Sequence, residues 1–181
     1  MSLFVAVRPE EGAIEDLQEV LHSLRRLPSA PDVRWISPDL WHITVGFLGD
    51  PDDAVDEEVA ERLHDWSEYA PIDGVRLASA GAFGRQVLWA GVEEGASRDR
   101  LAAFAHALPA LVRGSGAVPD RRTWRPHLTI GRMRRGSPLP FVDALLGYRG
   151  PQWSVTEVEL IRSTGGPRPH HEIVARISLD G

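Results

Sequence analysis

Two copies of one short phrase carry residue types that suit acid-base chemistry. The segment His42-Ile43-Thr44-Val45-Gly46 recurs as His127-Leu128-Thr129-Ile130-Gly131. On a β-strand successive side chains point to opposite faces, so the histidine and threonine of each copy share one face. With 7 histidines in 181 residues, only about 0.2 His-x-Thr triplets are expected by chance. We therefore interpret the pair as one divided site, although two amphipathic strands that each carry a histidine would give the same pattern.

Paired imidazoles suit in-line transfer at phosphorus. One can take a proton from the attacking oxygen while the other gives a proton to the leaving oxygen, and the pKa of histidine lies near neutrality. The threonine hydroxyls can donate hydrogen bonds to the non-bridging phosphoryl oxygens. We expect His42 and His127 to be catalytic, and Thr44 and Thr129 to contact the substrate.

Positive charge surrounds the second copy. Six arginines and one acid lie in the stretch 120–135, and arginine can hold a phosphate by two parallel hydrogen bonds. We expect an anionic ligand here, although a solvated arginine-rich surface would look the same. The arginines are Arg121, Arg122, Arg125, Arg132, Arg134 and Arg135.

Other positions near this chemistry have simpler interpretations. Gly46 and Gly131 either leave room for a bulky substrate or mark β-bulges. The histidines at positions 22, 64 and 106 lie in predicted helices, and we expect them to take no part in the chemistry.

Several residue types are missing, and their absence excludes whole reaction classes. All 20 basic residues are arginine, which excludes lysine-nucleotide intermediates, Schiff bases and the Walker A lysine. The absence of cysteine excludes thiolate nucleophiles, disulfides and cysteine-based zinc sites. A zinc site on His42 and His127 would need a further ligand, and neither copy contains Asp or Glu. We therefore expect neither a metal nor a cofactor.

The overall composition is that of an ordinary globular protein, with 43% hydrophobic and 25% charged residues. The net charge of −6 argues against broad binding to long nucleic acid, which requires phosphate neutralisation over a large surface. No apolar run approaches the roughly 20 residues of a membrane span, and the first residues do not resemble a signal peptide. We expect a cytoplasmic protein with no membrane partner.

Hydrophobic periodicity predicts eight strands and four helices. Because a motif strand follows the first helix-containing unit in each half, the order suggests an internal duplication. We expect a single domain over residues 1–181, made of two similar lobes, and a monomer. The predicted strands are 3–7, 33–36, 41–48, 72–80, 86–92, 126–132, 153–162 and 172–179, with a turn at 81–85. The predicted helices are 9–24, 55–66, 97–108 (limited by Pro109) and 141–146, and Gly165-Gly166 is predicted to form a turn.

The paired H-x-T-x pattern resembles the two-histidine (2H) phosphoesterase superfamily. Within it, the sequence is most similar to the RNA 2′,3′-cyclic phosphodiesterases, also called 2′-5′ RNA ligases. The segments that look like this branch are 3–7, 42–49, 87–92 and 126–132, so the resemblance extends over nearly the full length.

The resemblance implies an α+β, bilobed, pseudo-twofold fold, with mostly antiparallel sheets lining a central cleft and helices outside. It implies hydrolysis of a 2′,3′-cyclic phosphate at an RNA end or on a nucleotide, typically to a 2′-phosphate, without metal or nucleotide cofactor. Joining of RNA ends by a 2′-5′ bond would be the reverse reaction. The positions that match the family's motifs are His42, Thr44, His127 and Thr129.

The resemblance also suggests roles for neighbouring residues. His127 would activate water and His42 would protonate the leaving 3′ oxygen, although the opposite order fits the motif equally well. Arg125 and Arg132 are expected to contact the phosphate. The family usually carries an aromatic residue, often Tyr, where this chain has His170-His171, so His171 would contact the base by stacking, or the substrate differs from a normal RNA end.

Two other functions fit the same motifs. One is a non-catalytic module that binds RNA ends or nucleotides. The other is a phosphodiesterase acting on a different small cyclic phosphate or on a 2′-5′ oligonucleotide.

Overall fold

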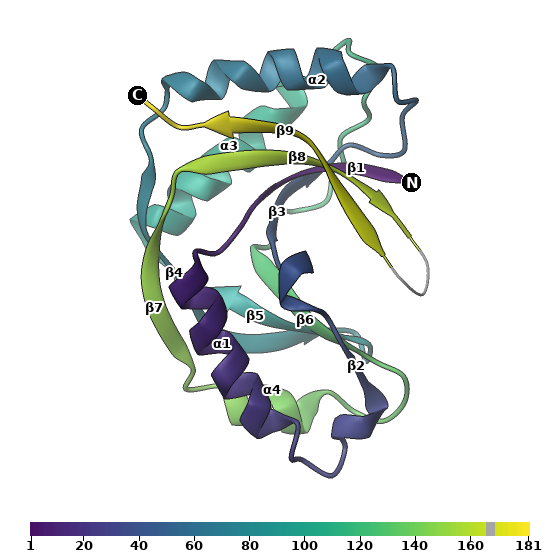
Figure 1. Cartoon of the computed structure of the whole chain (residues 1–181), viewed down its shortest axis with the longest axis vertical. Helices are drawn as coiled ribbons and strands as arrows, with labels where there is room; N and C mark the ends of the chain where they lie inside the picture. The colour runs from purple at the N-terminus through teal and green to yellow at the C-terminus, as the bar shows by residue number, and fades with distance from the viewer. Residues whose placement is uncertain (166–168) are drawn as a thin grey trace.

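One antiparallel sheet organises the molecule (Figure 1), seen in a computed structural model that describes residues 1–165 and 169–181. The sheet has 9 strands in the order β7-β4-β5-β6-β3-β1-β8-β9, and β2 also pairs with β6. The strands are β1 Ser2–Val7, β2 Val33–Trp35, β3 Ile43–Phe47, β4 Ile72–Phe83, β5 Val87–Val92, β6 His127–Met133, β7 Arg149–Val155, β8 Glu157–Thr164 and β9 His170–Ser178.

Helices pack on the outside of this sheet. The helix α1 (Glu11–Leu24) buries Ala13, Leu17, Leu21 and Leu24, at the spacing that gives a helix one apolar face. The others are α2 (Val55–Leu63), α3 (Ala96–Leu111) and α4 (Leu139–Leu145). Figure 1 shows α2 and α3 at one end of the molecule and α1 and α4 at the other. Within the described residues, no helix combines the length and apolar character needed to cross a bilayer.

The strand order is symmetric about the boundary between β3 and β6. Along this order four strands lie on each side of it, with β2 paired to β6 as the ninth. Each central strand is flanked by a strand that leads into a long helix, β1 before α1 and β5 before α3. The two motif strands therefore meet at the middle of the molecule (Figure 1). This arrangement confirms the expected bilobed α+β fold with antiparallel sheets.

The predicted single strand over 153–162 is wrong. It is two strands, β7 and β8, which pair with β4 and β1 on opposite sides of the sheet. The buried residues change phase at the junction, from Trp153 and Val155 to Val158 and Leu160. The chain thus passes from one half of the sheet to the other at this point, so the halves of the sheet are not halves of the sequence.

Two predicted boundaries also fail. The helix expected to end before Pro109 continues as α3 to Leu111. Proline lacks only its own backbone N–H donor, and the following turn still closes, because the Val112 N–H donates to the Leu108 carbonyl at 3.1 Å. The turn expected at 81–85 starts later, because Gly81 pairs with Trp89 in the β4–β5 ladder. A Cβ on Gly81 would lie 2.3 Å from the Trp89 ring. The turn predicted at Gly165-Gly166 extends beyond the described residues.

Candidate active site

The two motif strands lie side by side. Ile43 of β3 pairs with Leu128 of β6 in an antiparallel ladder. If this register is extended by one residue in each direction, His42 lies opposite Thr129 and Thr44 lies opposite His127. The two histidines are then diagonal neighbours on one face, a spacing of roughly 7–8 Å between residues and somewhat less between their Cβ atoms. A phosphoryl group placed between them would have an imidazole on either side.

Each motif contains a β-bulge at the same position. Consecutive residues of β1 pair with Gly46 and then Thr44, and consecutive residues of β5 pair with Gly131 and then Thr129. Val45 and Ile130 are left without a partner in these ladders, so they are the extra residues of the two bulges. The glycines allow a neighbouring side chain to pack closely against each strand. A Cβ on Gly46 would meet Leu108 Cδ2 at 2.5 Å, and one on Gly131 would meet Val33 Cγ1 at 2.6 Å. Of the two interpretations given to these glycines, the structure supports the bulge.

The bulge in β6 changes which residues face the cleft. Without an extra residue, Gly131 would follow Thr129 on the open face and Arg132 would point away. Instead Gly131 is buried, while Thr129 and Arg132 both line the cleft. The bulge therefore brings the Arg132 guanidinium to the same side as the two histidines.

Backbone carbonyls orient both imidazoles in the same way. His42 Nδ1 lies 2.7 Å from the Leu40 carbonyl oxygen, and His127 Nδ1 lies 2.7 Å from the Arg125 carbonyl oxygen. A carbonyl only accepts hydrogen bonds, so each Nδ1 carries the proton and donates it. In the neutral imidazole the lone pair is then on Nε2. Each histidine is thereby prepared to accept a proton through Nε2.

Aromatic rings also hold each histidine. The Phe4 ring centroid is 4.9 Å from that of His42, and the Phe83 ring meets His127 edge-on at 4.7 Å. The pKa of His42 is lowered to about 4, mainly by burial and in smaller part by the charges of nearby His171 and Arg8. Burial also lowers the pKa of His127, against the raising effect of its carbonyl bond. Both imidazoles are therefore mostly neutral near pH 7.

A cleft of about 1390 Å³ surrounds these residues. Every residue predicted for the site lines it: His42, Thr44, Arg125, His127, Thr129, Arg132 and His171. The His171 ring lies edge-on to His42, with centroids 5.2 Å apart. Burial is the main cause that lowers the pKa of His171.

The arginine-rich stretch divides between cleft and surface. Arg121, Arg122 and Arg125 line the cleft, and Arg122 is paired with Asp120. This segment lies along β3 rather than β6, because the Asp120 N–H donates to the Phe47 carbonyl at 2.9 Å. Arg134 and Arg135 do not appear among the residues that line the cleft.

The sequence did not point to several cleft residues. Phe4, Phe83 and Arg34 line the cleft, and so does His106, which we expected to lie outside the chemistry. Arg34 precedes the first motif in the chain, but its strand β2 pairs with β6, which carries the second. Only strand pairing reveals such a position. The sole sequence signal is that Arg34 alternates with Val33 and Trp35 in a short predicted strand.

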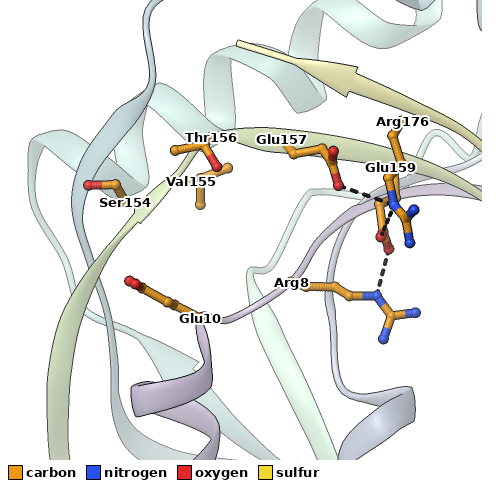
Figure 2. A pocket seen from close by; sticks show the side chains of 8 residues that line it. All are labelled: Arg8, Glu10, Ser154, Val155, Thr156, Glu157, Glu159 and Arg176. Atoms are coloured by element: carbon orange, nitrogen blue, oxygen red, sulfur yellow. Dashed lines mark hydrogen bonds and ion pairs between the residues drawn. The ribbon is translucent and has the colours of Figure 1, made fainter.

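A second hollow, of about 590 Å³, is lined by Arg8, Glu10 and residues of the stretch 154–159 together with Arg176, and it is drawn in Figure 2. Its two arginines are paired with acids: Arg8 with Glu159 at 2.6 Å, and Arg176 with Glu157 and Glu159 at 3.3 Å each. Arg8 also donates to the Asp39 carbonyl, in the short turn that leads to His42. This hollow therefore holds a structural ion-pair network that supports the His42 segment.

Neither hollow offers an evident metal site. Across residues 1–165 and 169–181, no three His, Asp or Glu side chains are grouped so that they could hold a metal ion. The arrangement that the structure does build is two neutral imidazoles, two hydroxyls and several guanidinium groups around one open volume.

Comparisons with known proteins point in the same direction. The family model described as the 2′-5′ RNA ligase superfamily matches residues 14–167. An RNA 2′,3′-cyclic phosphodiesterase of Aquifex aeolicus is 30% identical over 157 residues, which cover 82% of each chain. Another, of Geobacillus stearothermophilus, is 28% identical over 159 residues, covering 84% of this chain and 50% of that one, so this chain spans half of its length.

The fold has a close structural counterpart. The crystal structure of E. coli LigT complexed with 3′-AMP superposes with a TM-score of 0.76 at 20% identity, covering 99% of this chain and 98% of that one.

Proposed function

Since the chain belongs to the 2′-5′ RNA ligase superfamily, we propose that it is an RNA 2′,3′-cyclic phosphodiesterase that converts a 2′,3′-cyclic phosphate end into a 2′-phosphate. The observation that supports this most directly is the antiparallel pairing of two His-x-Thr strands across one arginine-lined cleft. The relatives from Aquifex aeolicus and Geobacillus stearothermophilus, both RNA 2′,3′-cyclic phosphodiesterases, support the same reaction.

The reaction needs only groups that line the cleft. A water oxygen attacks phosphorus, the bond between phosphorus and the 3′ oxygen breaks, and the products are a 2′-phosphate and a 3′-hydroxyl. One imidazole Nε2 accepts a proton from the water while the other histidine donates a proton to the 3′ oxygen. The donor must be protonated first, and the negative phosphate favours this charged form by raising its pKa.

The remaining cleft groups act on the phosphate and the nucleoside. The hydroxyls of Thr44 and Thr129 donate to the non-bridging oxygens, where negative charge grows in the transition state. Arg125 and Arg132 supply positive charge and paired hydrogen bonds to the phosphate groups of the substrate. His171 contacts the base. All of these residues come from one chain, so we propose that a monomer is active and that no metal is required.

A substrate screen tests this function. The protein is incubated with nucleoside 2′,3′-cyclic phosphates in the presence and absence of a chelator, and the product is identified as the 2′- or 3′-phosphate. We expect turnover to the 2′-phosphate at a rate that the chelator does not change. Binding without turnover would instead indicate a recognition module. Turnover only of another cyclic phosphate or a 2′-5′ oligonucleotide would change the substrate.

A further inference from the structure

Two arginines face each other at one end of the cleft. In the β2–β6 ladder Arg34 is the direct partner of Arg132, so their side chains leave the sheet on the same face. Both line the cleft. On the opposite face, their neighbours Val33 and Met133 are buried in the core, and Trp35 packs edge-on against Phe141 at 5.7 Å. The backbone that carries the two arginines is therefore firmly placed.

Neither guanidinium is compensated by a protein acid. In the part of the chain that the structure describes, no hydrogen bond or ion pair involves the side chain of Arg34 or Arg132. Several other arginines do have an acid partner, as Arg162 has Asp56 and Arg149 has Glu93. Like charges directly opposite in a ladder are unfavourable. A bound anion would turn this repulsion into attraction.

The position of the pair relative to the histidines suggests which anion. Arg132 lies three residues beyond Thr129, at most about 10 Å along the strand, and the flexible side chains shorten that distance. A phosphate held by the histidines and threonines would be the cyclic one. The next phosphate of the same ligand is attached to the 5′ oxygen of the same nucleoside.

We propose that Arg34 and Arg132 form a second anion subsite, which binds the phosphate on the 5′ oxygen of the terminal nucleoside. This inference rests on the proposed function, because the cyclic phosphate fixes the position of the nucleoside. The bound group is either a free 5′-phosphate or the internucleotide phosphate of an RNA end. Its recognition would make the enzyme prefer phosphorylated or longer substrates over a bare nucleoside cyclic phosphate.

Three substrates test the subsite: a nucleoside 2′,3′-cyclic phosphate, the same compound with a 5′-phosphate, and a dinucleotide that ends in the cyclic phosphate. The measured quantity is the ratio of kcat/KM for each longer substrate to that for the first. We expect Arg34→Ala to lower this ratio about 10-fold through KM, since hydrogen bonds to charged groups contribute on this scale. Arg34→Lys should recover part of it.

The matched control is Arg134→Ala, because Arg134 is exposed and does not line the cleft. It should leave the ratio as in the wild type. A fall with both longer substrates supports a site for any 5′-phosphate, and a fall with the dinucleotide alone supports the internucleotide phosphate. A wild-type enzyme without preference, or an equal effect of Arg34→Ala and Arg134→Ala, would overturn the subsite.

A binding measurement separates this inference from the proposed reaction. Should no cyclic phosphate be hydrolysed, calorimetry can compare adenosine 3′,5′-bisphosphate with 3′-AMP. We expect the bisphosphate to bind about 10-fold more tightly to the wild type, and this advantage to disappear in Arg34→Ala. Equal affinities of the wild type for both ligands would reject the subsite whatever the reaction is.

Discussion

Each histidine of the cleft has the same three kinds of neighbour. A carbonyl two residues earlier accepts from Nδ1, a phenylalanine ring packs against the imidazole, and a threonine follows two residues later on the same face. Their surroundings differ in charge, because Arg8 and His171 lie near His42 and lower its pKa. Two matching units in unequal electrostatic environments suit a reaction in which one histidine must gain a proton and the other must lose one.

The threonine hydroxyls provide a prediction at this scale. Thr44→Val and Thr129→Val keep the β-branched shape that suits a strand and remove only the hydroxyl. We expect each to lower kcat by about 10- to 1000-fold, because a donor to the transition-state charge is lost. Steady-state kinetics on a nucleoside 2′,3′-cyclic phosphate measures this. Unchanged kcat in both variants would show that the hydroxyls do not contact the phosphate.

The depressed pKa of His42 predicts a pH-dependent stability. The folded protein holds this pKa at about 4, whereas the pKa of a free histidine side chain is about 6.5. The unfolded chain therefore binds the proton first, so the free energy of unfolding falls as the pH drops from about 6.5 to about 4. The loss from this group is on the order of 3 kcal/mol.

Urea unfolding at several pH values checks this slope. His42→Gln should flatten it, while His22→Gln, on the exposed face of α1, serves as the control for loss of an imidazole. If the wild type and His42→Gln lose stability equally between pH 6.5 and 4, the buried histidine is not the cause.

At the scale of elements, the segment that precedes each motif in the chain packs beside the strand that carries the other motif. Strand β2, before the first motif, pairs with β6, and the segment near Asp120, before the second motif, bonds to the end of β3. Each motif strand is thus bordered by chain from the other half. This packing places Arg34 beside Arg132, and the arginines of 121–125 beside the first motif.

The bulge glycines give a prediction about these elements. Gly131→Ala forces a Cβ against Val33 Cγ1, a stiff β-branched side chain in the core, and we expect a loss of about 1–3 kcal/mol in the free energy of unfolding. Gly46→Ala meets only the flexible end of Leu108 and should cost less. Urea denaturation measures both.

A double variant identifies the cause of that loss. Val33→Ala removes the atom that clashes, so Gly131→Ala should be less destabilising in the Val33→Ala background than in the wild type. Strictly additive losses would mean that the steric account of the bulge is incorrect.

Much of the central site could be predicted from the sequence, because a repeated pentad with strand periodicity carries both the residue types and the face they share. The bounds of individual strands and turns were harder to predict. The single strand predicted over 153–162 missed the phase change at Thr156, and the 81–85 turn was placed too early because Gly81 serves cross-strand packing. Arg34 and Phe83 reach the cleft through pairings between distant segments, which local patterns do not encode.

At the scale of the whole molecule, charge is unevenly distributed. The chain carries a net charge of −6, yet the described residues that line the cleft include five arginines and one aspartate. The cleft can thus attract a short anionic substrate, while the remaining surface disfavours long nucleic acid.

This distribution predicts a salt dependence. For a dinucleotide that ends in a cyclic phosphate, kcat/KM should fall as salt rises from about 50 to about 500 mM, with a logarithmic slope of about −1.4 if two phosphates are neutralised. Arg34→Ala should make the slope shallower by about 0.7. A slope of zero in the wild type would mean that the cleft arginines do not act on the substrate.

The central claim is that two histidines, one from each motif strand, share a single reaction at phosphorus. It is tested most directly by the rate of hydrolysis of a nucleoside 2′,3′-cyclic phosphate by the wild type, His42→Ala, His127→Ala and the double variant, all shown to be folded. We predict that each single variant loses at least about 1000-fold in kcat, and that the double variant is scarcely slower than either, because residues that act as one unit are not additive. Wild-type turnover in either single variant would contradict the account.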